Sequence, residues 1–473
     1  MPRNTPPIKD DLMNVLDERY DVRSGVFAAM DSDVTMTLNE HGEYQSVIPG
    51  SVISNPDARK ELSSVSAMSN NSPSEDDVAH DLFESIKDIK KTDVIGYHLG
   101  LFAGHVVEDD YRKKASSGGL TTWLLVELLK KKHIDGVIHM HVSADKNKLF
   151  EYGISKTVKD IRNNTKTRYY PGELSKPLRE ITKLPGKYAV VGLPSIIMEV
   201  RLLARQNPEI GKKIAFAFGL ICGHQKSTKY AESLAWQVGI KPGDLQSIDF
   251  RKKIPGAHAN DYATEMTGLI NGKLKTIVKK QPELFGSHWG YGFFKTKFSD
   301  FTDDALNETA DVALGDAWLP AYKKDSLGNN ILIVRNKLIL SILEAGLSAG
   351  KLKLDELSKA DILKSQSGLI HHTRDDLPYR LHKRKLAGKW YPKKRVKESG
   401  KIPLFRRLVQ NLRENLRDKS HQYHKEAVEL DDWTHFERKM KPLVLKYKLV
   451  YVLIQIKRRG FGWFIRALVK RVR

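Results

Sequence analysis

The fold is decided by residues 187–222, which read KYAVVGLPSIIMEVRLLARQNPEIGKKIAFAFGLIC. The runs at its two ends, 187–194 and 213–222, are short, rich in apolar and β-branched residues and bounded by Gly or Pro, as in buried strands. Residues 196–206 between them have helical spacing and end in cationic side chains, which favour a helix C-terminus. The stretch therefore predicts a strand–helix–strand unit of a parallel sheet.

The same alternation extends in both directions along the chain. Residues 121–132 predict a helix and 135–142 a strand, and further strands are expected at 310–318 and 330–336. The predicted fold class is α/β, with a mixed, largely parallel sheet and flanking helices, in a domain that spans residues 93–350.

The regions outside this domain have a different composition. Residues 1–80 are polar, and 63–77 (SSVSAMSNNSPSEDD) are typical of a flexible linker. Residues 351–473 predict a helical tail, in which 405–417 place apolar side chains on one face and arginines on the other. That apolar face contains Phe405, Leu408, Val409, Leu412 and Leu416.

Charge is concentrated in this tail. The formal net charge is +22 over 473 residues, and residues 380–473 hold 28 Lys and Arg against 8 Asp and Glu. The rest of the chain is therefore nearly neutral, and any polyanionic partner belongs to the tail. Binding to an anionic membrane surface is the favoured interpretation, since Trp463 and two phenylalanines stand among the basic clusters. A helical protein partner is the second interpretation, and nucleic acid is disfavoured because no binding motif accompanies the charge.

Cysteine and apolar content restrict the class of protein. The single cysteine, Cys222, excludes an internal disulfide and any all-cysteine iron–sulfur cluster. His139 and His141 share a strand face that suits a metal, but without a third ligand packing is the better interpretation, and no metal is expected. No secretory signal or run of 18 apolar residues is found, so a cytoplasmic protein is expected, peripheral to the inner face of the membrane.

Three segments carry residues suited to ligand chemistry. ASSGGLTT (115–122) combines glycines, hydroxyls and a helix N-terminus, which suit a phosphate or pyrophosphate, although Ser117 acting as a simple helix cap is the alternative. VVGLPS (190–195) ends a strand where open α/β sheets bind ligands, and Ser195 capping the next helix is again the alternative. NETADVALGDAW (307–318) places Asp316 beside Trp318 at a strand end, to orient a ligand or to cap a turn.

Taken together and in order, these segments resemble the coenzyme F-420 hydrogenase/dehydrogenase beta-subunit family over about residues 93–350. ASSGG, DGV, VVGLP, GLICG, FR (250–251) and ADVALGDAW carry the resemblance. It implies an FAD-binding α/β domain that transfers hydride and passes electrons to iron–sulfur clusters. The residues that it implies for the cofactor or an anionic substrate are Ser116, Ser117, Gly118, Gly119, Thr121, Gly192, Pro194, Ser195, Arg251, Asp316, Trp318 and Arg335.

The chain departs from the family pattern at its cysteines. Ser195 stands where the family has a cysteine after GLP, and Ser299 and Thr302 replace a CxxC pair. Near the N-terminus, Asp21, Ser24 and Phe27 replace cysteines of a ferredoxin-like segment, so residues 1–80 are interpreted as a degenerate one. Hydroxyl and phenyl groups do not hold iron–sulfur clusters, which are therefore expected to be absent.

The resemblance predicts an FAD-dependent oxidoreductase that transfers hydride without clusters. Cysteine-depleted members with basic tails are associated with bacterial surface-polysaccharide synthesis, which suggests a sugar or lipid-linked substrate. The rival hypotheses are a scaffold of a polysaccharide assembly that keeps the fold without cofactor, and a transferase using the same cleft for a phosphorylated ligand. No catalytic residue follows from the sequence.

Overall fold

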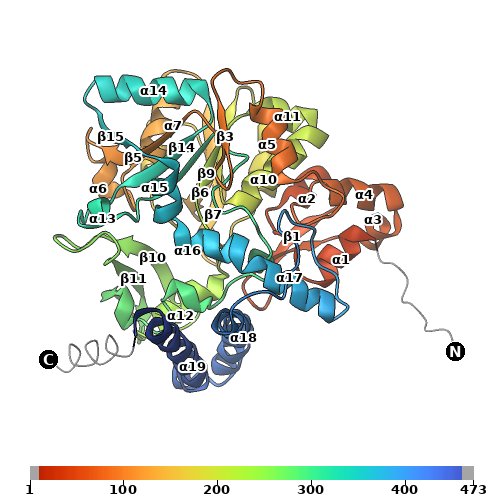
Figure 1. Ribbon diagram of the computed structural model, residues 1–473, viewed down its shortest axis with the longest axis vertical. Coiled ribbons are helices and arrows are strands. Elements are labelled where there is room, and N and C mark those ends of the chain that lie inside the picture. Colours follow the sequence, from red (N-terminus) through yellow and green to blue (C-terminus); the bar gives the residue numbers. More distant parts are fainter. Residues whose placement is uncertain (1–9, 461–473) are drawn as a thin grey trace.

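An eight-stranded sheet forms the centre of the computed structural model, which describes residues 10–460 (Figure 1). In spatial order its strands are β15 (Leu352–Glu356), β5 (Gly100–Val106), β14 (Asn330–Val334), β13 (Val312–Asp316), β9 (Ile214–Leu220), β8 (Tyr188–Gly192), β6 (Gly136–Val142) and β7 (Phe150–Ser155). The neighbours β13, β9, β8 and β6 are parallel, and every other pairing is antiparallel. The mixed α/β fold is confirmed, and its parallel part is limited to these four strands.

Alternate residues of the central strands pack on opposite faces of the sheet. In β8, Val190 joins a cluster with α10, whereas Ala189 and Val191 join another with α7 and α14. The first face is covered by α9 (Ser175–Lys183), α10 (Pro194–Gln206), α11 (Pro208–Lys213) and the N-terminal region. The second is covered by α7 (Leu120–Lys130), α8 (Val158–Asn163) and α14 (Lys337–Ser348). Two short helices, α6 (Tyr111–Lys114) and α13 (Pro320–Lys323), precede α7 and β14 in the chain.

The N-terminal region packs against α9 and α10 (Figure 1). Its elements are α1 (Asp11–Asp17), α2 (Val26–Met30), the hairpin β1 (Thr35–Leu38) and β2 (Tyr44–Val47), α3 (Gly50–Ser54), α4 (Pro56–Ser64), α5 (Glu75–Phe83), and the hairpin β3 (Lys90–Thr92) and β4 (Gly96–His98). The linker prediction for 63–77 is wrong. Val65, Ser66 and Met68 are buried. Serine hydroxyls donate hydrogen bonds to backbone carbonyls of the segment, as in the 2.7 Å bond from Ser72 Oγ to the Ser66 carbonyl.

A small second sheet and a helical hairpin complete the molecule. The sheet consists of β10 (Leu245–Lys252), β11 (Ala263–Ile270) and β12 (Lys273–Lys280), beside α12 (Thr228–Trp236). The 3-10 turns Gln281–Glu283, Trp289–Tyr291 and Phe298–Asp300 lead back to β13. After β15 come α15 (Lys359–Ser365), α16 (Ser367–Ile370), a π-helical turn (His371–Asp375), α17 (Leu377–Leu386), α18 (Leu404–Glu429) and α19 (Trp433–Arg459).

The tail is helical, as predicted, but it is part of the folded body. Strand β15 extends the main sheet beyond residue 350. Helices α18 and α19 pack side by side, and α18 contacts α12 and the turn Trp289–Tyr291 (Figure 1). Of the predicted apolar face of 405–417, Val409 and Leu416 are buried, whereas Leu408 is exposed. The arginines are not all on the outer face, because Arg417 is buried among core residues. Trp463 and the phenylalanines at 461 and 464 lie outside the described residues.

No helix within residues 10–460 combines the length and apolar character needed to cross a bilayer.

Candidate functional site

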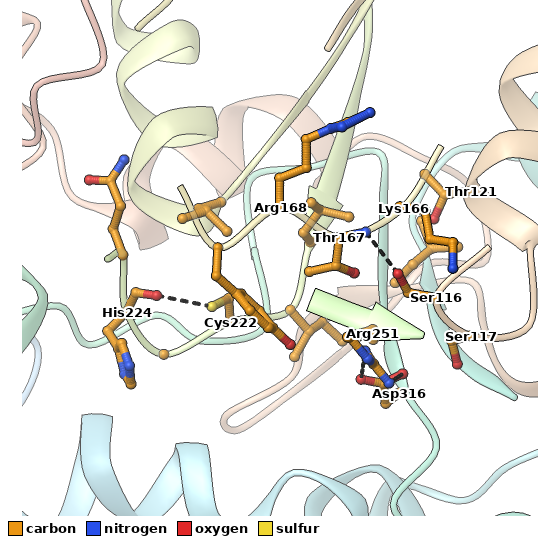
Figure 2. Close-up of a pocket in the computed structure, with 18 of the residues that line it drawn as sticks. Ser116, Ser117, Thr121, Lys166, Thr167, Arg168, Cys222, His224, Arg251 and Asp316 are labelled. Atoms are coloured by element: carbon orange, nitrogen blue, oxygen red, sulfur yellow. Dashed lines mark hydrogen bonds and ion pairs between the residues drawn. The ribbon is translucent and has the colours of Figure 1, made fainter. Parts of the chain in front are cut away.

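A cavity of about 630 Å³ lies at the carboxyl ends of the parallel strands (Figure 2). Val191 of β8, Leu220 of β9 and Leu314 of β13 line it, and the loops that follow these strands form its walls. Its volume falls in the range of small-molecule and cofactor sites, and its position is the one where open α/β sheets bind ligands.

The serine–glycine turn forms one wall of this cavity (Figure 2). Ser116 Oγ accepts a 2.8 Å hydrogen bond from the Thr167 amide, and Ser117 Oγ donates to the Asn329 carbonyl at 2.8 Å. The N-cap of α7 is Gly119, whose φ of 85° suits glycine, so the interpretation of Ser117 as the cap is wrong. Thr121, in the first turn of α7, lines the cavity beside the helix N-terminus, where anions bind favourably.

Arg251 and Asp316 form a bidentate ion pair on a second wall. The Nη atoms of Arg251 donate to the two carboxylate oxygens at 2.7 and 3.1 Å. Burial alone would lower the pKa of Arg251, but Asp316 raises it above its usual value. The guanidinium lies 5.0 Å from the Tyr262 ring and 5.9 Å from the Trp318 ring, and its Nε has no hydrogen-bond partner within residues 10–460.

Five residues of the predicted site do not line the cavity: Gly118, Gly192, Pro194, Ser195 and Arg335. A Cβ on Gly118 would lie 2.6 Å from the Gly104 carbonyl oxygen, so this glycine permits close packing of the backbone. Gly192 ends β8, and Pro194 and Ser195 begin α10, whose N-cap is Leu193. Ser195 is therefore not the cap either, while Leu193 itself lines the cavity.

Arg335 has a structural environment. Its side chain has no exposed surface, and the guanidinium donates to the carbonyl oxygens of Ile95, Tyr97, Asn307 and Ala310 at 2.8 to 3.2 Å. The prediction that it contacts a phosphate or substrate is wrong, because its donors hold together two backbone segments, 95–97 and 307–310.

An aromatic and basic part of the cavity was not predicted. His224 stacks on Trp289 with ring centroids 4.3 Å apart, and Tyr169 lies 4.6 Å from the same indole. The ammonium of Lys226 lies 4.8 Å above that indole. Arg168 also lines the cavity. The loop 221–226 follows β9 just as GLPS follows β8. Its position at the carboxyl end of a parallel strand could therefore have predicted His224 and Lys226 as site residues. Tyr169 lies in a loop before β8, and no sequence pattern marks that loop as part of a site.

Buried polar atoms in this cavity lack partners. Within the described chain, no hydrogen bond reaches Nε2 of His224 or Nε of Arg168. Burial lowers the pKa of His224 well below its usual value, so the imidazole is neutral near pH 7. Unpaired buried donors are costly, and a polar ligand that pairs with them lowers that cost.

The residues that replace the family's cluster cysteines make structural contacts within the protein. Asp21 and Ser24 are buried, Ser24 Oγ bonds to the Glu199 carboxyl of α10, and Phe27 belongs to the hydrophobic core. Ser299 Oγ accepts from the Gln225 amide at 3.1 Å, and Thr302 Oγ1 donates to the Ser299 carbonyl at 3.4 Å.

The remaining thiol and the histidine pair have partners within the protein. Cys222 lines the cavity, its Sγ donates to the His224 carbonyl at 3.3 Å, and burial raises the pKa of the thiol. His139 and His141 both approach Ser155 Oγ. Between residues 10 and 460, no three His, Cys, Asp or Glu residues gather as metal ligands.

An α/β sheet with a cavity of cofactor size at the carboxyl ends of its parallel strands, lined by a glycine–serine turn and by basic and aromatic groups, is the arrangement of an α/β ligand-binding protein. The family is shown by two sequence models of the coenzyme F420 hydrogenase/dehydrogenase beta-subunit family. Residues 101–179 match the model of its N-terminal part, and residues 186–360 match the model of its C-terminal part. The chain therefore belongs to this family of FAD-binding oxidoreductases.

Among solved structures, the chain is similar to one from the xenon-derivatised F420-reducing [NiFe] hydrogenase complex of Methanosarcina barkeri. The two are 18% identical with a TM-score of 0.48, and the match covers 64% of this chain and 98% of the other. No curated protein matches the chain.

Proposed function

We propose that the protein is an FAD-dependent oxidoreductase that transfers hydride between two organic molecules without iron–sulfur clusters. The observation that carries the proposal is the cofactor-sized cavity in which the buried Nε donors of Arg168 and Arg251 lack partners within the described residues. Family membership supports FAD as the group that meets them. With Cys222 as the single cysteine, the chain has no set of thiolates for an electron-transfer cluster.

The residues present fit such a dinucleotide. Thr121 and the N-terminal turn of α7 would hold the diphosphate, together with Lys166 on the same side of the cavity (Figure 2). Trp318, Tyr262 and Tyr169 offer flat surfaces for the ring systems. When bound, FAD supplies an isoalloxazine that accepts or donates a hydride.

The chain's own groups would orient the ligands and hold the charge of the site. The ion pair with Asp316 keeps Arg251 protonated and fixes its guanidinium plane, leaving Nε as the donor directed to a ligand. Neutral His224, held against Trp289, offers a second donor or acceptor at Nε2.

An absorption spectrum of the purified protein tests this proposal. We expect a flavin band, either as isolated or after reconstitution with FAD, which bleaches when a hydride donor is added under anaerobic conditions. Thr121→Val should weaken FAD binding, whereas Thr182→Val, outside the cavity, should not. A colourless protein that takes up no FAD would contradict the proposal and favour a scaffold without cofactor.

We also propose that the protein works at the inner face of the membrane, on a sugar or lipid-linked intermediate of surface-polysaccharide synthesis. The substrate rests on the resemblance of cysteine-depleted family members. The membrane rests on the basic tail and on Leu445, Leu449 and Leu453 of α19, which are exposed beside lysines. Four-residue spacing places these leucines on one face of the helix, as in helices that bind at an interface.

A further inference from the structure

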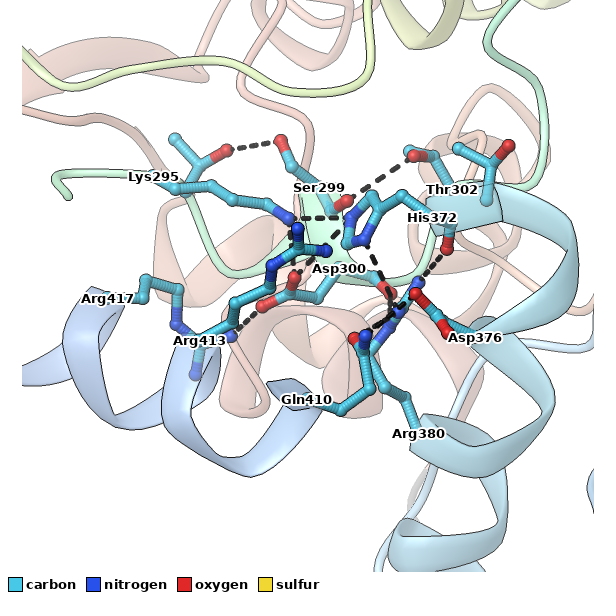
Figure 3. A network of polar contacts seen from close by, with 12 residues as sticks. Lys295, Ser299, Asp300, Thr302, His372, Asp376, Arg380, Gln410, Arg413 and Arg417 are labelled. Carbon is cyan, nitrogen blue, oxygen red and sulfur yellow. Dashed lines mark hydrogen bonds and ion pairs between the residues drawn. The ribbon is translucent and has the colours of Figure 1, made fainter. Parts of the chain in front are cut away.

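One wall of the cavity is built partly from residues that lie beyond the family-matched segments. Lys226 and Lys295 come from the matched region, whereas His372 and Arg413 follow residue 360. Figure 3 shows Lys295, His372 and Arg413 converging around Asp300. We call Lys226, Lys295 and Arg413, with His224, the basic wall.

The basic side chains of the basic wall outnumber the carboxylates that face them. Asp300 is the carboxylate at this wall, and it already pairs with Lys295 and with Arg417 of α18. Within residues 10–460, no carboxylate lies within ion-pair distance of Lys226 or Arg413.

These two cations are bonded to neutral oxygens instead. Lys226 Nζ donates to the Phe293 carbonyl at 2.6 Å. Arg413 donates to the Gly290 carbonyl at 3.1 Å and to the hydroxyls of Tyr447 and Tyr451 at 3.1 to 3.3 Å. A neutral oxygen leaves the charge of each side chain uncompensated, which is costly in a poorly hydrated cavity. Burial and the neighbouring Lys295 lower the pKa of Lys226 well below its usual value, and an anion in the cavity would favour its protonated form.

The compensating group has to be a compact anion. Lys226 and Lys295 present ammonium groups, which act as point charges and bind phosphate oxygens without a fixed plane. His224 Nε2 adds a buried position that has no partner among the described residues on the same side. The adjacent Trp289 and Tyr169 rings offer flat surfaces to the part of a ligand next to the anion.

We propose that the basic wall binds a phosphoryl group of the second substrate, the organic molecule that exchanges hydride with the flavin. The assignment deepens the proposed function and rests on it for the identity of the reaction, but not for the anion site itself. The serine–glycine turn and Lys166 serve the cofactor, and the basic wall serves the substrate. The segment after residue 360 thereby contributes Arg413 as a substrate-binding residue.

Calorimetric titration of the full chain with inorganic pyrophosphate tests the anion site, both without FAD and after saturation with FAD. We expect pyrophosphate to bind in both states. Lys226→Met and Arg413→Gln should each weaken binding by about tenfold or more. The matched controls are Lys229→Met and Arg407→Gln, which should bind pyrophosphate as the wild type does. In the wild type, Lys229 pairs with Glu232, and Arg407 bonds to exposed backbone carbonyls.

Lys226→Met keeps the aliphatic stem and removes a buried amino group that has no ion-pair partner within residues 10–460, so it is expected to fold. Wild-type affinity in both Lys226→Met and Arg413→Gln would overturn the inference. So would strict competition between pyrophosphate and FAD, because the wall would then belong to the cofactor site. Tighter binding of citrate than of pyrophosphate would overturn the phosphoryl assignment.

The two proposals fail separately. Protein that binds no FAD but binds pyrophosphate through Lys226 and Arg413 refutes the flavin and keeps the anion site. Protein that binds FAD but no pyrophosphate keeps the flavin and refutes the basic wall.

Discussion

His424 of α18 is a buried histidine whose surroundings keep it neutral. It packs edge-on against Trp236, Phe294 and Phe436, and burial lowers its pKa to about 3. The unfolded chain, with a pKa near 6.5, binds the proton more readily. Its contribution to stability is therefore complete above about pH 6.5 and is lost as the pH falls toward 3.

We predict that His424→Phe reduces the acid sensitivity of folding. In the wild type this one group lowers the free energy of unfolding by about 1.4 kcal/mol per pH unit below 6.5. Urea unfolding at pH 7 and pH 5 measures the difference. His258→Gln, in an exposed loop, is the control and should keep the wild-type pH dependence. An unchanged slope in His424→Phe would contradict the assignment.

Arg335 gives a second prediction at this scale. Arg335→Met removes the guanidinium donors of four buried carbonyl groups, of which Asn307 keeps the Ala310 amide, and should lower the free energy of unfolding by about 3–5 kcal/mol. Chemical denaturation measures the loss, and Arg205→Met, an exposed arginine paired with Asp81, is the control. A loss below about 1 kcal/mol in Arg335→Met would show that the carbonyls find other partners.

Single residues of the site were predictable only where chain geometry constrained them. Thr121, implied by the family resemblance, and Asp316 both line the cavity, because strand and helix ends meet at one edge of a parallel sheet. Arg335 was misplaced, because sequence does not distinguish an arginine bonded to backbone carbonyls from one that faces a ligand. Tyr169 was missed since its loop reaches the cavity only through tertiary packing.

At the scale of elements, the buried parallel strands were predicted best. Strands β8 and β9 are continuous apolar runs because both faces of the sheet are covered, and β6 begins as one before His139. Strands β7 and β15 contain more polar residues and were not predicted, since each lies at an edge of the sheet, where polar residues are tolerated. Segment 63–77 was misread because its serines bond to backbone and to one another rather than to water.

The attachment of α18 to the core depends on Asp300. Burial would raise the pKa of this carboxyl, but Lys295, Arg417 and Arg380 hold it below its usual value. The carboxylate therefore compensates cations from three parts of the chain, including α18 (Figure 3). This ion cluster explains why arginines predicted for the outer face of residues 405–417 turn inward.

We predict that Asp300→Asn loosens α18 and destabilises the protein. It leaves buried cations unpaired and should lower the free energy of unfolding by about 3–5 kcal/mol. Hydrogen exchange should rise across residues 404–429. Asp418→Asn is a matched control, because Asp418 also pairs with Arg417 but is exposed, and its effect should stay below about 1 kcal/mol. Equal effects of the two variants would contradict a special role for the buried carboxylate.

At the scale of the whole molecule, net charge located the basic region but not its surfaces. Arg413 and Arg417 of the tail contact the core, so the tail is not a uniformly basic exterior. One exposed basic and apolar surface of the described tail lies on α19, where Lys446 and Lys448 flank Leu445 and Leu449. Composition alone cannot make this division, because it depends on which helix face the core covers.

The membrane proposal predicts that α19 binds anionic lipid through this surface. Leu445, Leu449 and Leu453 are 64%, 59% and 38% exposed, and their replacement by Ser should reduce co-sedimentation with phosphatidylglycerol vesicles, most clearly at low salt. Replacing Leu386, Leu404 and Leu430, exposed elsewhere, by Ser is the control and should not. A chain truncated after Gly460 is the second variant, because a deletion that began within α19 would remove the buried Val444, Tyr447 and Val450. If the α19 variant and the truncated chain both sediment like the wild type, membrane binding through the tail is refuted.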